Sequence, residues 1–220
     1  IRSRARNETR GVLPEPPTVI LPTAITGTET RSGFRVSRRF SQTPTRTGND
    51  SSHSTNAGTL SSPFKSIEKA VSVVKGGETI YLRGGTYNLT ATITLSKSGA
   101  ENTVISVIAY PGEVPVLNFS AQTQSSGNRG LVLTGSWWHI KGISITGAGD
   151  NGMIISGGNN NLIDQCSFYR NRDTGLQIDN GASDNQARNC DSYFHAEPPD
   201  NDDADGFAPK LTAGSGNSFY

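Results

Sequence analysis

The stretch Gly130-Leu-Val-Leu-Thr-Gly135 recurs along the second half of the chain and decides the fold. Its counterparts are Gly152-Met-Ile-Ile-Ser-Gly157, Gly175-Leu-Gln-Ile-Asp-Asn-Gly181 and Gly206-Phe-Ala-Pro-Lys-Leu211. The four phrases start 22, 23 and 31 residues apart. A second phrase lies between them, at intervals of 23 and 24 residues: His139-Ile-Lys-Gly-Ile-Ser-Ile145, Leu162-Ile-Asp-Gln-Cys-Ser-Phe168 and Gln186-Ala-Arg-Asn-Cys-Asp-Ser192.

A period of 22 to 24 residues, made of short alternating strands and Gly, Asn or Asp turns, is typical of a solenoid of stacked β coils. Successive coils would pair as parallel strands and place equivalent residues above one another. We therefore expect Ile140, Ile163 and Ala187 to form one inward column. The sequence predicts an all-β parallel solenoid from about Thr79 to Tyr220.

Three asparagines share one turn position of the repeat: Asn161, Asn185 and Asn217. They can be ordinary turn residues that tolerate the left-handed conformation. Because all three hold the same register, we favour a ladder in which each amide bonds its neighbour.

The interval between Gly175 and Gly206 is about eight residues too long for the period. The surplus is the acidic segment from His195 to Asp205, which contains Asp200, Asp202 and Asp203. Insertions in a solenoid become loops on one face, and that face often binds the ligand. The acidic insertion is therefore the first place to look for a functional site.

The N-terminal part of the chain differs in composition from the rest. Residues 1–46 contain nine Arg and three Glu and are interrupted by five prolines, whereas the rest has a net charge of −5. We interpret 1–46 as a disordered or loosely attached tail and 47–220 as the β-helix domain. A basic arm or an organelle transit segment are the alternatives for the tail.

A single helix is predicted before the first strand. Ser62 and Pro63 form a helix-start pair, and apolar residues follow at helical spacing to Val74, before Gly76 and Gly77 end the pattern. A helix at Pro63–Lys75 would cover the apolar end of the first coil.

The cysteines and histidines point to no recognisable reactive set. Cys166 and Cys190 occupy the same slot of successive coils, where their side chains point the same way. This favours two buried free thiols over a disulfide. The three histidines, His53, His139 and His195, are scattered and assemble no triad.

Two general phrases, Gly58-Thr-Leu-Ser-Ser-Pro-Phe and Ile80-Tyr-Leu-Arg-Gly-Gly-Thr-Tyr87, occur together with Asn189-Cys-Asp-Ser-Tyr193. A more specific phrase, Ala204-Asp-Gly-Phe-Ala-Pro-Lys210, follows the aspartates of the acidic insertion. On these phrases, the sequence from about Gly48 onward resembles the right-handed parallel β-helix pectate lyases, most closely polysaccharide lyase family 9. The tail before Gly48 is not covered.

The resemblance implies calcium-dependent β-elimination of polygalacturonate. It maps one calcium-ligand aspartate onto Asp205. The family's other calcium aspartates and its lysine base follow in later coils, and this chain ends at Tyr220 before them. We therefore expect the domain to be incomplete at its C-terminus, to contain no catalytic base and to be inactive alone.

Asp202 and Asp203 are weaker candidates for Ca²⁺ ligands, because calcium takes six to eight oxygens. An acidic loop can equally be solvated. Lys210 is a candidate substrate-binding residue, and pairing with an aspartate is its alternative role.

The resemblance also implies a secreted protein with an acidic polysaccharide as its partner. No signal peptide or membrane-spanning run is visible, and we expect neither nucleic acid nor membrane as a partner. Two alternatives stay open because a solenoid alone does not fix a reaction. One is a non-catalytic glycan-binding or surface module, and the other is a different uronic-acid lyase or an epimerase.

Overall fold

The computed structural model describes residues 38–41, 58–60, 63–196 and 204–220, with side chains for all of these except 38–41. They lie in one compact unit, Phe34–Tyr220, whereas a second unit, Ile1–Gly33, lies outside the described residues. The expected tail 1–46 is therefore described only at strand β1 (Arg38–Ser41). This strand pairs in parallel with β2 (Thr79–Leu82), so the sheet begins inside a segment where we expected no regular structure.

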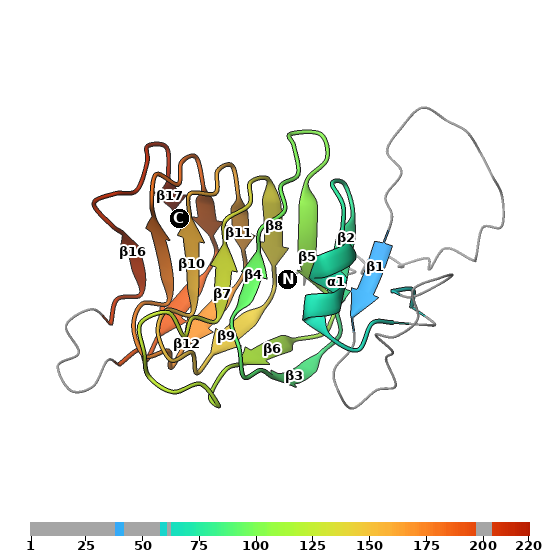
Figure 1. Cartoon of the computed structure of the whole chain (residues 1–220), viewed down its shortest axis with the longest axis horizontal. Coiled ribbons are helices and arrows are strands. Elements are labelled where there is room, and N and C mark those ends of the chain that lie inside the picture. Colours follow the sequence, from blue (N-terminus) through green and yellow to red (C-terminus); the bar gives the residue numbers. More distant parts are fainter. Residues whose placement is uncertain (1–37, 42–57, 61–62, 197–203) are drawn as a thin grey trace, which may run out of the picture. The chain divides into compact units, whose positions relative to one another are not determined.

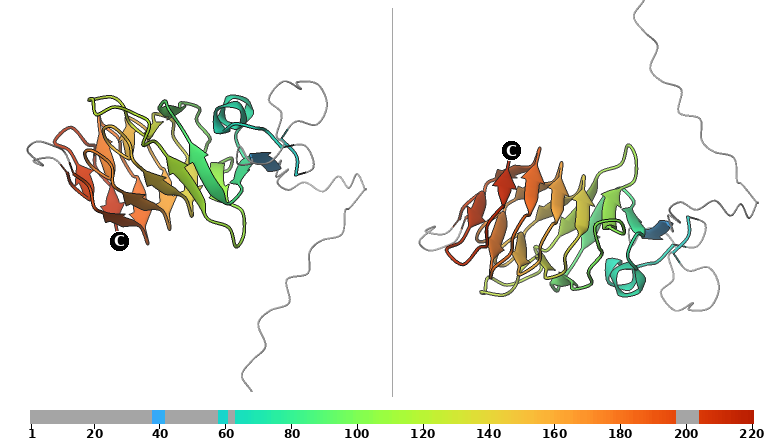
Figure 2. Two further views of the ribbon diagram at one scale, coloured as in Figure 1. Left: turned by 90° about the horizontal axis from the view of Figure 1, so that it is seen from below. Right: turned by 90° about the horizontal axis from the view of Figure 1, so that it is seen from above.

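Three parallel sheets run along the coils (Figures 1 and 2). Sheet A contains β1, β2, β5 (Ile105–Ala109), β8 (Trp138–Lys141), β11 (Leu162–Asp164), β14 (Gln186–Arg188) and β17 (Ser218–Phe219). Sheet B contains β3 (Gly85–Asn88), β6 (Pro115–Asn118), β9 (Ser144–Thr146), β12 (Ser167–Tyr169) and β15 (Asp191–Tyr193). Sheet C contains β4 (Ile93–Leu95), β7 (Leu131–Leu133), β10 (Met153–Ser156), β13 (Leu176–Asp179) and β16 (Phe207–Pro209). Neighbouring strands come from successive coils, which confirms the predicted parallel solenoid.

The inward column predicted from the repeat is present in sheet A. Ile140 pairs with Ile163, and Ile163 with Ala187, and all three are buried. The same column continues to Ile80 and Val107 in the earlier coils. Burying one isoleucine contributes about 1.5–3 kcal/mol. A slip of one residue would turn the whole column outward, so the register is strongly specified.

The asparagine ladder is also confirmed. The amide Nδ2 of Asn161 donates to Asn185 Oδ1 at 2.9 Å, and Asn185 Nδ2 donates to Asn217 Oδ1 at 3.0 Å. Each acceptor oxygen also takes the backbone N–H of the residue before it in the ladder. Asn161 and Asn185 are buried, so the ladder satisfies polar groups that water does not reach.

Helix α1 (Ile67–Val73) is shorter than the predicted helix at Pro63–Lys75. Its N-cap is Ser66, whose hydroxyl accepts the N–H of Lys69 at 3.2 Å, so the prediction that Ser62 and Pro63 start the helix was wrong. Capping of the coil interior is confirmed, because Ile67, Ala70 and Val71 are buried in the core cluster.

The cysteines Cys166 and Cys190 are both free, as the sequence favoured. Cys166 is buried and Cys190 half-buried, and they occupy equivalent positions between sheets A and B. The contact with Cys190, together with burial, raises the pKa of the Cys166 thiol.

We predict that Asn185→Ala lowers the free energy of unfolding by about 2 kcal/mol or more, because it leaves buried donors of Asn161 without an acceptor. Urea unfolding measures the change. Asn118→Ala is the matched control, since that amide bonds Asn88 on an exposed face. Equal losses in the two variants would contradict a special role for the buried ladder.

Candidate functional site at the edge of sheet C

The turns that lead from sheet B into sheet C bring Asp205 into register with earlier coils. The backbone N–H of Gly152 donates to Thr174 O at 2.9 Å, and that of Gly175 donates to Asp205 O at 2.9 Å. Thr174 and Asp205 therefore hold the same position in successive coils. A Cβ at Gly152 would collide with the side-chain amide of Asn171, which explains why this repeated phrase begins with glycine.

The candidate metal ligand Asp205 is exposed and lies two residues before the start of β16, at the end of the acidic insertion. The other two candidates, Asp202 and Asp203, lie outside the described residues. Within 58–60, 63–196 and 204–220, no group of three or more His, Cys, Asp or Glu side chains is placed to hold a metal ion. An exposed carboxylate suits the preference of calcium for oxygen, but the described residues alone do not complete a ligand set.

The two coils before Asp205 carry a polar network at the same edge. Asn151 Nδ2 donates to Asp173 Oδ2 at 3.1 Å and to Gln177 Oε1 at 3.0 Å. Asp150 forms an ion pair with Arg129 at 3.1 Å. Burial and the neighbouring Asp150 raise the pKa of Asp173. This edge of sheet C therefore carries two acidic side chains before the acidic insertion begins, and Arg129 offsets the charge of one of them, Asp150.

Lys210 lies at the opposite end of β16 from Asp205. Five residues of extended chain place their Cα atoms about 16 Å apart. The positive charge of Lys210 contributes to a lowered pKa of Asp179, after the larger effect of the hydrogen bond from Thr212. The structure therefore brings Lys210 towards Asp179 and does not bring it together with Asp205.

A network that we did not predict from the sequence holds the start of the insertion. Ser192 Oγ donates to the carbonyl of Gly206 at 2.7 Å and lies 2.9 Å from His195 Nε2. His195 Nδ1 accepts the backbone N–H of Asn171 at 3.3 Å. A side chain at Gly175 would collide with the Ser192 hydroxyl. These contacts thus connect Gly206, the residue after Asp205, to Ser192 and, through His195, to Asn171 of the coil before.

These contacts require a neutral imidazole that is protonated on Nε2. Burial lowers the pKa of His195, in agreement with that state. In the preceding coil, Asn171 Oδ1 accepts the N–H of Ala148 at 3.0 Å. His195 takes the corresponding place one coil later, and this equivalence is the signal in the sequence that could have revealed its role.

We predict that part of the stability is lost on acidification through His195. Because its folded pKa is lowered, its contribution is fully present above the unfolded pKa of about 6.5 and is lost as the pH falls through the folded pKa. The measurement is urea unfolding of the whole chain between about pH 7.5 and 5.

His195→Asn is the matched control, since an asparagine oxygen can accept the same N–H as Asn171 does for Ala148 but does not titrate. The difference in free energy of unfolding between the wild type and His195→Asn should decrease as the pH falls. A difference that is constant with pH would contradict the assignment.

Comparisons with known proteins agree with this fold. The family described as "Pel9A-like, right handed beta helix region" matches residues 47–220. Pectate lyase L of Paenibacillus polymyxa (strain SC2) is 44% identical over 164 residues, which are 70% of this chain and 36% of that protein. Pectate lyase L of Dickeya chrysanthemi is 36% identical over 197 residues, which are 86% of this chain and 45% of that protein.

Among solved structures, the crystal structure of pectate lyase Pel9A superimposes with a TM-score of 0.72 at 34% identity. The match covers 86% of this chain and 48% of the Pel9A chain. The chain thus spans less than half the length of these relatives. By its sequence match over residues 47–220 and by its coil architecture, the chain belongs to the Pel9A-like right-handed β-helix family, polysaccharide lyase family 9.

Proposed function

We propose that this chain is part of a calcium-dependent pectate lyase that cleaves polygalacturonate by β-elimination. The observation that carries the proposal is the position of Asp205, exposed at the edge of sheet C at the end of the acidic insertion. The family membership supports the reaction class, and the names of the relatives support pectate as the substrate.

The reaction removes a proton beside a uronate carboxylate, whose negative charge resists further charge. Bound calcium offsets that charge and stabilises the transition state. In this chain, Asp205 would hold the ion, with Asp202 and Asp203 as further candidates from the insertion. Ser192 and His195 would act as positioning residues, because they fix the backbone next to Asp205.

Lys210 is proposed to contact substrate at the far end of β16, and no residue of this chain is assigned as the base. We further propose that the protein is secreted, since its substrate is a polymer outside cells. Within the described residues, no helix is both long and apolar enough to span a membrane.

We predict that Asp205→Ala weakens calcium binding at least tenfold, about 1.4 kcal/mol, because a charged oxygen ligand is lost. Calorimetric titration with calcium chloride measures the affinity. Asp191→Ala removes the same charge from an exposed position on sheet B and should leave calcium affinity within about twofold. Equal affinities of wild type and Asp205→Ala would refute the assignment.

We predict that residues 1–220 alone release no unsaturated product from polygalacturonate with calcium present. The reason is that no residue of this chain is assigned as the base, and Lys210 is separated from Asp205 by the length of β16. Ultraviolet absorbance of the product is the readout. Turnover by this chain would reveal an overlooked base, and Lys210→Ala would then show whether it is that residue.

A further inference from the structure

A second surface, on a different sheet from Asp205, forms a groove of about 570 Å³. It lies over the ends of the sheet B strands and the turns that follow them. Its polar and aromatic wall includes Asn118, Gln122, Thr146, Tyr169, Arg170, Arg172 and Phe194. We propose that this groove binds an acidic oligosaccharide through its uronate carboxylates, without calcium. The inference does not depend on the lyase reaction.

One column of sheet B pairs Asn88, Asn118, Thr146, Tyr169 and Tyr193 in successive coils. Its three middle members, Asn118, Thr146 and Tyr169, line the groove. Asn118 Nδ2 donates to Asn88 Oδ1 at 2.8 Å. The rings of Tyr169 and Tyr193 stack with centroids 5.3 Å apart and planes 9° apart. The column therefore presents amides, a hydroxyl and aromatic rings in a fixed row.

The turn position after this column is left-handed in three successive coils, at Gly147, Arg170 and Phe194, with φ of 73°, 53° and 58°. Glycine accepts this conformation freely, whereas other residues resist it by about 1–2 kcal/mol. Gln165 and Asn189 adopt the same conformation in another turn of the coils, so it belongs to the turn geometry. At this turn Arg170 is exposed and Phe194 is 73% exposed, so both side chains are accessible to a ligand.

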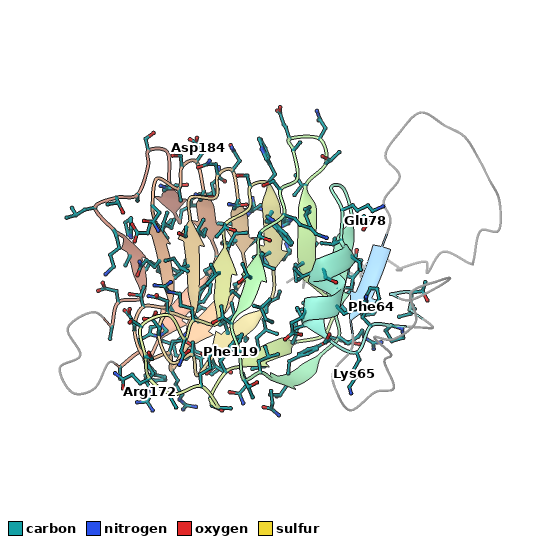
Figure 3. The ribbon with its side chains drawn as sticks, in the orientation of Figure 1. Phe64, Lys65, Glu78, Phe119, Arg172 and Asp184 are labelled. Carbon is teal, nitrogen blue, oxygen red and sulfur yellow. The ribbon has the colours of Figure 1, made fainter. Side chains whose placement is uncertain are left out.

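The described part of the groove carries positive charge. Among the described residues, its lining contains Arg170 and Arg172 and no carboxylate. The other arginines whose side chains the structure describes each pair with a carboxylate: Arg83 with Glu113, Arg129 with Asp150, and Arg188 with Asp164. Neither groove arginine pairs with a described acid, and Arg172 extends outward from the coils (Figure 3). The groove thus offers two guanidinium groups to an anion from outside.

The chemistry of the lining suits a sugar that carries a carboxylate. Guanidinium groups bind carboxylates in a bidentate manner, and aromatic rings such as Phe194 pack against the apolar face of a sugar. The amides and hydroxyls of Asn118, Gln122 and Thr146 suit sugar hydroxyls. A neutral glycan would leave both guanidinium groups unpaired.

The test is affinity electrophoresis of the whole chain in gels that contain polygalacturonate and EDTA. We expect Arg170→Gln/Arg172→Gln to weaken retention by about tenfold or more, because charge-assisted hydrogen bonds are lost. Glutamine should fit position 170, since Gln165 adopts the same φ of 53°. Lys65→Gln/Lys75→Gln, which removes two exposed positive charges near α1, should change retention by less than about twofold.

All variants keep the nine arginines of residues 1–46, so differences between them report on the groove. Equal retention of the groove variant and the wild type would overturn the proposal. An equal loss in the lysine control would overturn it too, because binding would then follow net charge. If residues 197–203 fill the groove instead, the groove variant would lose stability without losing retention, which also overturns it. Failure of the proposed lyase function would appear separately, in the calcium titration of Asp205→Ala.

Discussion

Coils of this protein complete many of their buried hydrogen bonds through the coils on either side. The amides of Asn161, Asn185 and Asn217 make this dependence visible, because each acceptor oxygen serves both the amide and the backbone N–H of its neighbour. A slipped register would leave these groups without partners in a place that water does not reach. Together with the inward Ile140 column, the ladder therefore fixes how the later coils align, and with them the surface columns of those coils.

Because the coil register fixes which side chains lie above one another, acidic and basic side chains can gather on different surfaces beside the turns between sheets B and C. The sheet C edge carries Asp150, Asp173 and Asp205 in three successive coils, while the sheet B groove carries Arg170 and Arg172. His195 lies between the two surfaces, since it follows Phe194 of the groove and contacts Ser192, which bonds Gly206. The segment from Ser192 to His195 thus places Phe194 in the groove. It also holds Gly206, the residue next to the candidate metal ligand Asp205.

The repeat in the sequence predicted much of the fold, because residues one period apart contact each other when the coils stack. It predicted the Ile140 column, the asparagine ladder and the position of the long insertion. It missed β1, because the pairing of Arg38–Ser41 with β2 is long-range and those residues belong to no repeat. It placed the start of the helix too early, because Ser66 competes with Ser62 as a cap and local propensity does not decide between them. The groove could not be predicted from the sequence, because its residues differ in type. The shared feature is the turn position of Gly147, Arg170 and Phe194.

The most direct test of the central claim, that the coil register delivers Asp205 as a calcium ligand at the edge of sheet C, is a crystal structure of the protein grown with calcium. The account predicts an anomalous scattering peak about 2.3–2.6 Å from a carboxylate oxygen of Asp205, with Ser192 still bonded to the carbonyl of Gly206. A calcium ion bound elsewhere, with the Asp205 carboxylate turned away from it, would contradict the account.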